Sequence, residues 1–152
     1  MRAGILILLM LFFVTGCKNE SSTVKSNLEK SLSGQNTQHK GKQLMEIQCN
    51  SCHSPTASED TRLAPPMIAV KRHYLTEDMS KEEFVEDILS WMQAPSVERS
   101  KMPGAVERFG MMLKMPLKEE DIIQIAEYMY ENKLQAPEWF EEHYNQRRRN
   151  QK

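Results

Sequence analysis

Apolar residues recur at helical intervals near the end of the chain. Within residues 118–131, Ile122, Ile125, Ala126 and Met129 stand at positions i, i+3, i+4 and i+7. This spacing places the four side chains on one face of an α-helix, where they can be buried together. The first turn of the segment is acidic, which suits the positive end of a helix dipole. The pattern therefore predicts an amphipathic helix over residues 118–131.

A second helical pattern precedes it, over residues 81–93. Three apolar side chains share one face of this segment: Phe84, Ile88 and Trp91. Ser80 and Glu83 have the spacing of a capping box, in which each side chain accepts the backbone N–H of the other residue. Pro95 follows and cannot continue a helix. We expect a helix over residues 81–93, with core packing as the role of its apolar face.

The N-terminus has a different pattern, in which Arg2 precedes an apolar run over residues 5–14. This arrangement is typical of a secretory signal peptide, and the run is shorter than the roughly 20 apolar residues of a spanning helix. The run ends in the residues Val-Thr-Gly followed by Cys17, which resemble the bacterial lipobox. The resemblance implies that residues 1–16 are removed and that Cys17 is acylated. A plain signal peptide is the alternative.

Residues 17–38 would then link the acylated cysteine to a folded domain. The segment is rich in Ser, Asn, Lys and Gln and has almost nothing to bury. Such a composition predicts a flexible tether, on which a domain can move between partners at a membrane surface. We therefore expect an exported protein that is anchored to a cell membrane by lipid and faces the periplasm.

The overall composition of the 152 residues argues against two classes of protein. The chain has 20 Lys and Arg against 21 Asp and Glu, a net charge of -1. This balance gives no support to nucleic-acid binding. The three cysteines are too few, and odd in number, for a fold held together by disulfides. Each cysteine therefore needs its own explanation.

Cys49 and Cys52, with His53 directly after them, form the Cys-x-x-Cys-His pattern of c-type haem attachment. Two thiols three positions apart on one turn can each form a thioether with a vinyl group of the same porphyrin. The adjacent imidazole is then held beneath the iron. A structural zinc site would need a second pair of ligands, and a thioredoxin-type pair would need a strand before a helix. The pattern predicts one covalently bound haem c.

Over residues 39–135 the chain resembles class I cytochromes c. Gly41 stands eight residues before Cys49, where that family has a small residue at the crossing of its first and last helices. Tyr128 stands where the family has an aromatic residue that packs into this crossing. Met45 departs from the family, which usually has an aromatic residue at this place. A methionine can fill the same space with a more flexible side chain.

The resemblance implies a small all-α domain of three to four helices around one haem. It also implies outer-sphere electron transfer, in which the iron cycles between ferrous and ferric states. The protein would then be an electron carrier and not an enzyme, alone or as a subunit of a larger oxidoreductase. Its partners would be other redox proteins and, through Cys17, the lipid bilayer.

Pro65 stands twelve residues after His53. In the resembled family, a proline at this interval offers its carbonyl to the N–H of the haem-binding imidazole. A hydrogen bond of this kind fixes the ring and raises its basicity as a ligand. An ordinary loop at the Pro-Pro pair of residues 65–66 is the alternative.

The sixth iron ligand is expected among four methionines that follow the second helix: Met102, Met111, Met112 and Met115. In the resembled family, the ligand precedes the packing aromatic of the last helix by sixteen or seventeen residues. Counting back from Tyr128 gives Met112 or Met111. Met102 and Met115 each precede a proline, as the family's ligand often does. We take Met112 as the predicted ligand, with the other three methionines and the histidines His39, His73 and His143 as alternatives.

The C-terminal residues 136–152 contain a cluster of aromatic residues followed by a cluster of basic residues. Trp139, Phe140 and Tyr144 are followed by three arginines at residues 147–149. The segment is expected to be a tail, either a short helix folded onto the domain or a solvated charged end.

Two other functions remain open from the sequence. One is a haem sensor or peroxidase whose sixth iron position is open. The other is a methionine-rich copper-binding lipoprotein, since thioethers favour Cu(I).

Overall fold

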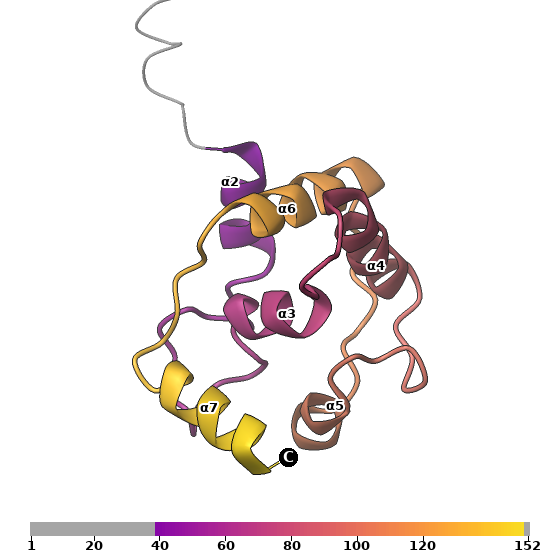
Figure 1. Ribbon diagram of the computed structural model, residues 1–152. Coiled ribbons are helices and arrows are strands. Elements are labelled where there is room, and N and C mark those ends of the chain that lie inside the picture. Colours follow the sequence, from indigo (N-terminus) through magenta and orange to yellow (C-terminus); the bar gives the residue numbers. More distant parts are fainter. Residues whose placement is uncertain (1–38, 151–152) are drawn as a thin grey trace, which may run out of the picture. The chain divides into compact units, whose positions relative to one another are not determined.

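The structure is a computed structural model that describes residues 39–150. Its helices are α2 (Lys40–Gln48), α3 (Met67–Tyr74), α4 (Lys81–Gln93), α5 (Pro103–Phe109), α6 (Glu119–Glu131) and α7 (Phe140–Asn150) (Figure 1). The described residues form no strand, which confirms the all-α class. The expected three to four helices were too few, because the short α3 and α5 carry no long apolar period. The predicted leader and tether, with Cys17, lie outside the described residues.

Helices α2 and α6 cross with their backbones in direct contact (Figure 1). Gly41 is buried at the crossing. A Cβ atom added to it would lie 1.9 Å from the carbonyl oxygen of Gln124 and 2.8 Å from the Cβ of Tyr128. Only glycine allows two helices to approach this closely. The predicted roles of Gly41 and Tyr128 in a helix crossing are therefore confirmed by the packing.

Helix α6 buries the predicted apolar stripe. All four of its residues, Ile122, Ile125, Ala126 and Met129, belong to the core. The helix begins one residue later than predicted, because Lys118 is its N-cap. Met45 of α2 packs in the same core, in the place where the cytochromes c that the sequence resembles usually have an aromatic side chain.

The C-terminal end of α6 is capped from a different helix. Its last turn has no basic residue of its own. Lys71 of α3 instead donates to the carbonyl oxygens of Tyr130 and Asn132, at 2.9 and 3.0 Å. A cation at this end also interacts favourably with the helix dipole. Burial lowers the pKa of the Lys71 ammonium, so this contact holds a partly desolvated charge.

Helix α4 has the predicted bounds and the predicted start. The Ser80 hydroxyl accepts the Glu83 N–H at 3.2 Å, and the Glu83 carboxylate accepts the Ser80 N–H at 2.8 Å. Phe84 is fully buried and Ile88 is buried beside it in the core that α4 shares with α6. Trp91 is half-buried against this core. The stripe on α4 therefore serves packing, as expected.

The C-terminal segment is part of the folded unit. Phe140, the first residue of α7, is only 2% exposed. The Trp139 indole N–H donates to the carbonyl oxygen of Ala57 at 2.8 Å, and Arg72 of α3 forms an ion pair with Glu141. The expected short helix on the domain is therefore present, with exposed arginines only at its far end. No helix of the described residues is both long and apolar enough to cross a membrane.

Candidate functional site

The two cysteines and the histidine of the Cys-x-x-Cys-His motif lie on one backbone turn at the end of α2. Cys49 is the C-cap of this helix, and its N–H donates to the Met45 carbonyl at 2.9 Å. The N–H groups of Cys52 and His53 both donate to the Cys49 carbonyl, at 3.2 and 2.9 Å. The turn therefore brings two thiols and one imidazole together, as attachment of one porphyrin requires.

The His53 ring is held by a single hydrogen bond to Pro65. Its Nδ1 atom lies 2.6 Å from the Pro65 carbonyl oxygen. Because a carbonyl can only accept, Nδ1 carries the proton and Nε2 keeps its lone pair. Burial lowers the pKa of His53, and the hydrogen bond to Pro65 partly opposes this shift. The imidazole is thus in the neutral tautomer that a metal ligand needs.

The two thiols differ in their surroundings. Cys49 is half-buried, whereas Cys52 is exposed. Burial raises the pKa of the Cys49 thiol to about 11, so it is protonated at neutral pH. The donor set of the turn, two thiols and a neutral imidazole with a free Nε2, fits a covalently attached haem. Residues 39–150 contain no cluster of three His, Cys, Asp or Glu side chains that could hold a metal ion.

The loop between His53 and Pro65 is supported by the C-terminal segment. Trp139 fixes this loop at Ala57, and His143 Nδ1 lies 2.6 Å from a carboxylate oxygen of Glu59. These contacts help to place the Pro65 carbonyl opposite His53. Sequence reasoning did not find Trp139 or His143 as supports of the site, because the contacts join residues about 80 positions apart and follow no periodic pattern.

The four candidate methionines differ in their environments. Met102 packs against the core as the N-cap of α5, whereas Met111 and Met112 are half-buried in the segment after α5. Met115 is 37% exposed. His73 is on the exposed side of α3 and donates from Nδ1 to the Ala69 carbonyl at 2.8 Å. The choice of Met112 as the sixth ligand stays a prediction.

The geometry of the turn and of the ring bound to Pro65 defines a site for c-type haem. A family model described as cytochrome c matches residues 38–133. The chain therefore belongs to the cytochrome c family, as a class I domain that carries electrons with a covalently bound haem c. Neither a curated protein nor a solved structure matches the chain significantly. The family match ends before α7 begins at Phe140.

Proposed function

We propose that this protein is a lipid-anchored electron carrier with one haem, attached through Cys49 and Cys52 and bound by His53. The hydrogen bond from His53 to Pro65 carries the proposal, because it selects the tautomer that leaves Nε2 free for iron. When bound, haem supplies a one-electron couple between ferrous and ferric iron. The chain would exchange these electrons with redox proteins at a membrane surface.

The residues around the site have separable roles in this proposal. The two cysteines prevent loss of the haem, which suits a protein outside the cytoplasm. Pro65 fixes the orientation of the imidazole plane and increases its electron donation. The supported loop between His53 and Pro65 keeps the distance from the His53 Nδ1 atom to the Pro65 carbonyl oxygen constant. Since outer-sphere transfer needs little rearrangement of the site, a rigid ligand frame is an advantage.

Covalent attachment is tested by replacing both thiols. The variant Cys49→Ala with Cys52→Ala should lose all haem staining on a denaturing gel, because neither vinyl group can form a thioether. A Cys17→Ala variant made in parallel should keep the stain. Staining that survives the double replacement would end the proposal of haem c at this turn.

We also propose that Met112 is the sixth ligand, on the interval of sixteen residues to Tyr128. Each of Met102, Met111, Met112 and Met115 is replaced by Ala in turn. Only the Met112 variant should lose the weak red sulfur-to-iron charge-transfer band of the ferric protein. Its reduction potential should fall, since loss of the thioether removes a ligand that raises the potential. The three other variants serve as controls.

A different result would assign the ligand elsewhere. If the Met102 variant loses the band and the Met112 variant keeps it, the ligand is the methionine at the start of α5. If all four single variants keep the band, none of these methionines is the sole sulfur ligand. Absence of the band in the unchanged protein, together with binding of carbon monoxide, would favour an open sixth site.

The membrane anchor rests on the lipobox-like sequence before Cys17. Acylation by more than one chain gives stable anchoring, because each buried methylene contributes about 0.8 kcal/mol. We predict that Cys17→Ser moves the protein from the membrane to the soluble fraction, or leaves the precursor uncut. Fractionation followed by mass determination of the N-terminus measures both. A Ser variant that is cut correctly and still sediments with membranes would show that another anchor exists.

A further inference from the structure

The loop of residues 54–64 joins the two partners of the imidazole hydrogen bond, His53 and Pro65. Within the described chain this loop forms no helix or strand. Its internal hydrogen bonds join residues two or three positions apart, such as the bond from the Ala57 N–H to the Ser54 hydroxyl at 3.1 Å. Such bonds fix only short stretches of the loop. The distance from the His53 Nδ1 atom to the Pro65 carbonyl oxygen therefore depends on contacts from outside the loop.

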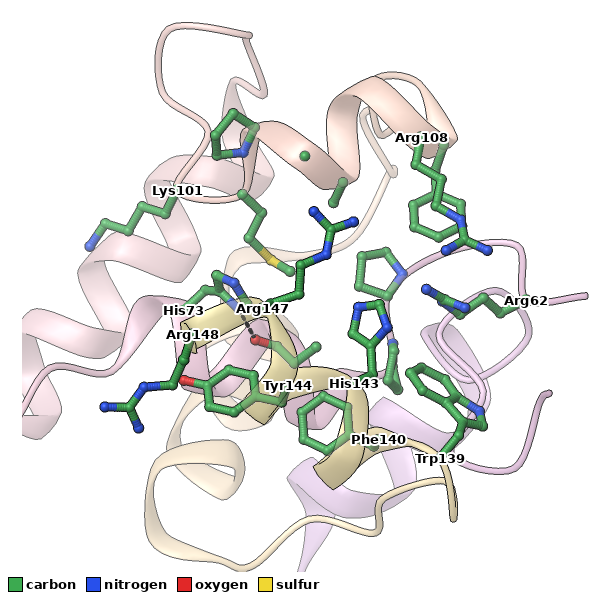
Figure 2. A pocket seen from close by; sticks show the side chains of 18 residues that line it. Arg62, His73, Lys101, Arg108, Trp139, Phe140, His143, Tyr144, Arg147 and Arg148 are labelled. Carbon is green, nitrogen blue, oxygen red and sulfur yellow. Dashed lines mark hydrogen bonds between the residues drawn. The ribbon is translucent and has the colours of Figure 1, made fainter. Parts of the chain in front are cut away.

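Trp139 contacts this loop in two places. Its indole N–H donates to the Ala57 carbonyl oxygen at 2.8 Å, and the Arg62 guanidinium carbon lies 4.4 Å from the centre of its ring, within range of a cation–π interaction. Ala57 stands four positions after His53, and Arg62 stands three positions before Pro65. One indole therefore bridges the two arms of the loop. Arg62 and Trp139 also line the pocket in Figure 2, which has Pro65 in its wall and is part of the candidate haem site.

The backbone that carries this indole is anchored in the domain core. Trp139 directly precedes α7, and its carbonyl accepts the His143 N–H at 3.2 Å. The next residue, Phe140, has its side chain in the core. The Phe140 N–H donates to the carbonyl of Pro137, which is itself buried, at 3.0 Å. The start of α7 is therefore a firm point from which the Trp139 side chain restrains the loop.

A second contact from α7 reaches the same loop but restrains it less. His143 Nδ1 lies 2.6 Å from a carboxylate oxygen of Glu59, and the two side chains are 26% and 39% exposed. An ion pair at this exposure contributes little, because solvent screens its charges, and it also requires a protonated imidazole. The half-buried Trp139 N–H donates to a neutral carbonyl and needs no charge. Trp139 is therefore the stronger of the two restraints.

We propose that Trp139 is a positioning residue for the haem ligand His53. It acts through the loop: by holding Ala57 and Arg62 it keeps the Pro65 carbonyl within hydrogen-bond distance of the imidazole, and so sets the orientation and basicity of the ring. This role depends on the proposed function of His53 as the iron ligand. Trp139 lies beyond the end of the family match at residue 133, so the restraint is not part of the frame that the family model describes.

The test follows the His53 ring N–H by nuclear magnetic resonance of the full-length protein with haem attached. Trp139→Phe removes the indole N–H but keeps an aromatic ring beside Arg62. The proton on His53 Nδ1 should exchange with solvent about fivefold faster, as expected for the loss of one ordinary hydrogen bond. The haem reduction potential should rise, because a weaker hydrogen bond to Pro65 leaves the imidazole less basic and favours ferrous iron.

Two further variants separate positioning from stability. Trp139→Ala removes the ring as well as the N–H and should accelerate the exchange by about tenfold or more. Ser80→Ala is the control, because it removes the capping box of α4 and lowers stability without touching the loop. It should leave both the exchange rate of the His53 ring N–H and the reduction potential as they are in the unchanged protein.

Two results would overturn this role of Trp139. An unchanged His53 exchange rate and an unchanged potential in both Trp139 variants would show that the indole only packs. Equal acceleration in Ser80→Ala would show that lower stability alone exposes the ring N–H. Haem staining on a denaturing gel distinguishes these results from failure of the proposed function. If the unchanged protein lacks the stain, haem attachment itself is overturned, and the role of Trp139 with it.

Discussion

Replacement of Gly41 by alanine is expected to lower the free energy of unfolding by about 2–4 kcal/mol. In an ordinary helix this change stabilises by up to about 1 kcal/mol. Here the new Cβ would lie 1.9 Å from the Gln124 carbonyl oxygen, which is backbone and cannot turn aside. The overlap forces α2 and α6 apart and disturbs the core beneath them. Guanidinium unfolding of the haem-bound protein, followed by circular dichroism, measures the loss.

Gly104 provides a matched control within the same chain. It lies in the first turn of α5, and a Cβ added there would have no atom within 4 Å. Gly104→Ala should therefore be neutral or stabilise by up to about 1 kcal/mol. Equal stability of the Gly41→Ala and Gly104→Ala proteins would mean that the α2–α6 crossing is looser than the structure indicates.

Replacement of Phe140 by alanine should lower the free energy of unfolding by about 3–5 kcal/mol. The residue lies beyond the family match, yet its side chain is in the core and among the most deeply buried of the described residues. Its ring also lies 5.0 Å from the Arg72 guanidinium carbon and 5.7 Å from the centre of the Tyr144 ring. Truncation would leave a cavity between α7 and α3. Denaturant unfolding again measures the effect.

Leu113→Ala is the control for this prediction. Leu113 is 80% exposed, so its truncation should change stability by less than about 0.5 kcal/mol. If Phe140→Ala were as mild as Leu113→Ala, α7 would be an appendage and not part of the core.

The helix bounds that depend on neighbouring residues were predicted well from the sequence. The apolar stripe and acidic first turn placed α6 to within one residue, and Ser80 with Glu83 placed the start of α4. The role of Gly41 at a helix crossing was also predictable, because the need for a small residue there follows from the family resemblance. For α4 and α6 the information lies within a few turns of one helix, whereas for Gly41 it comes from the resemblance to a family.

Contacts between distant segments could not be predicted in the same way. Trp139 bonds to Ala57 and Lys71 to Tyr130 across long stretches of chain, and no periodicity records such pairs. The short helices α3 and α5 depend on packing more than on their own patterns. The candidate methionines show the same limit, because an interval counted from Tyr128 fixes chain length but not the path of the loop.

Because Lys71 of α3 caps the end of α6, separation of α3 from α6 is linked to fraying of the last turn of α6. If α3 separates from α6, the Tyr130 and Asn132 carbonyls lose their donor and the last turn of α6 can fray. The Asn132 amide, which donates to the Tyr128 carbonyl at 3.1 Å, lies in this turn. Its hydrogen exchange with solvent therefore reports the separation of α3 from α6. The two helices belong to one cooperative unit, although 44 residues separate the end of α3 from the start of α6.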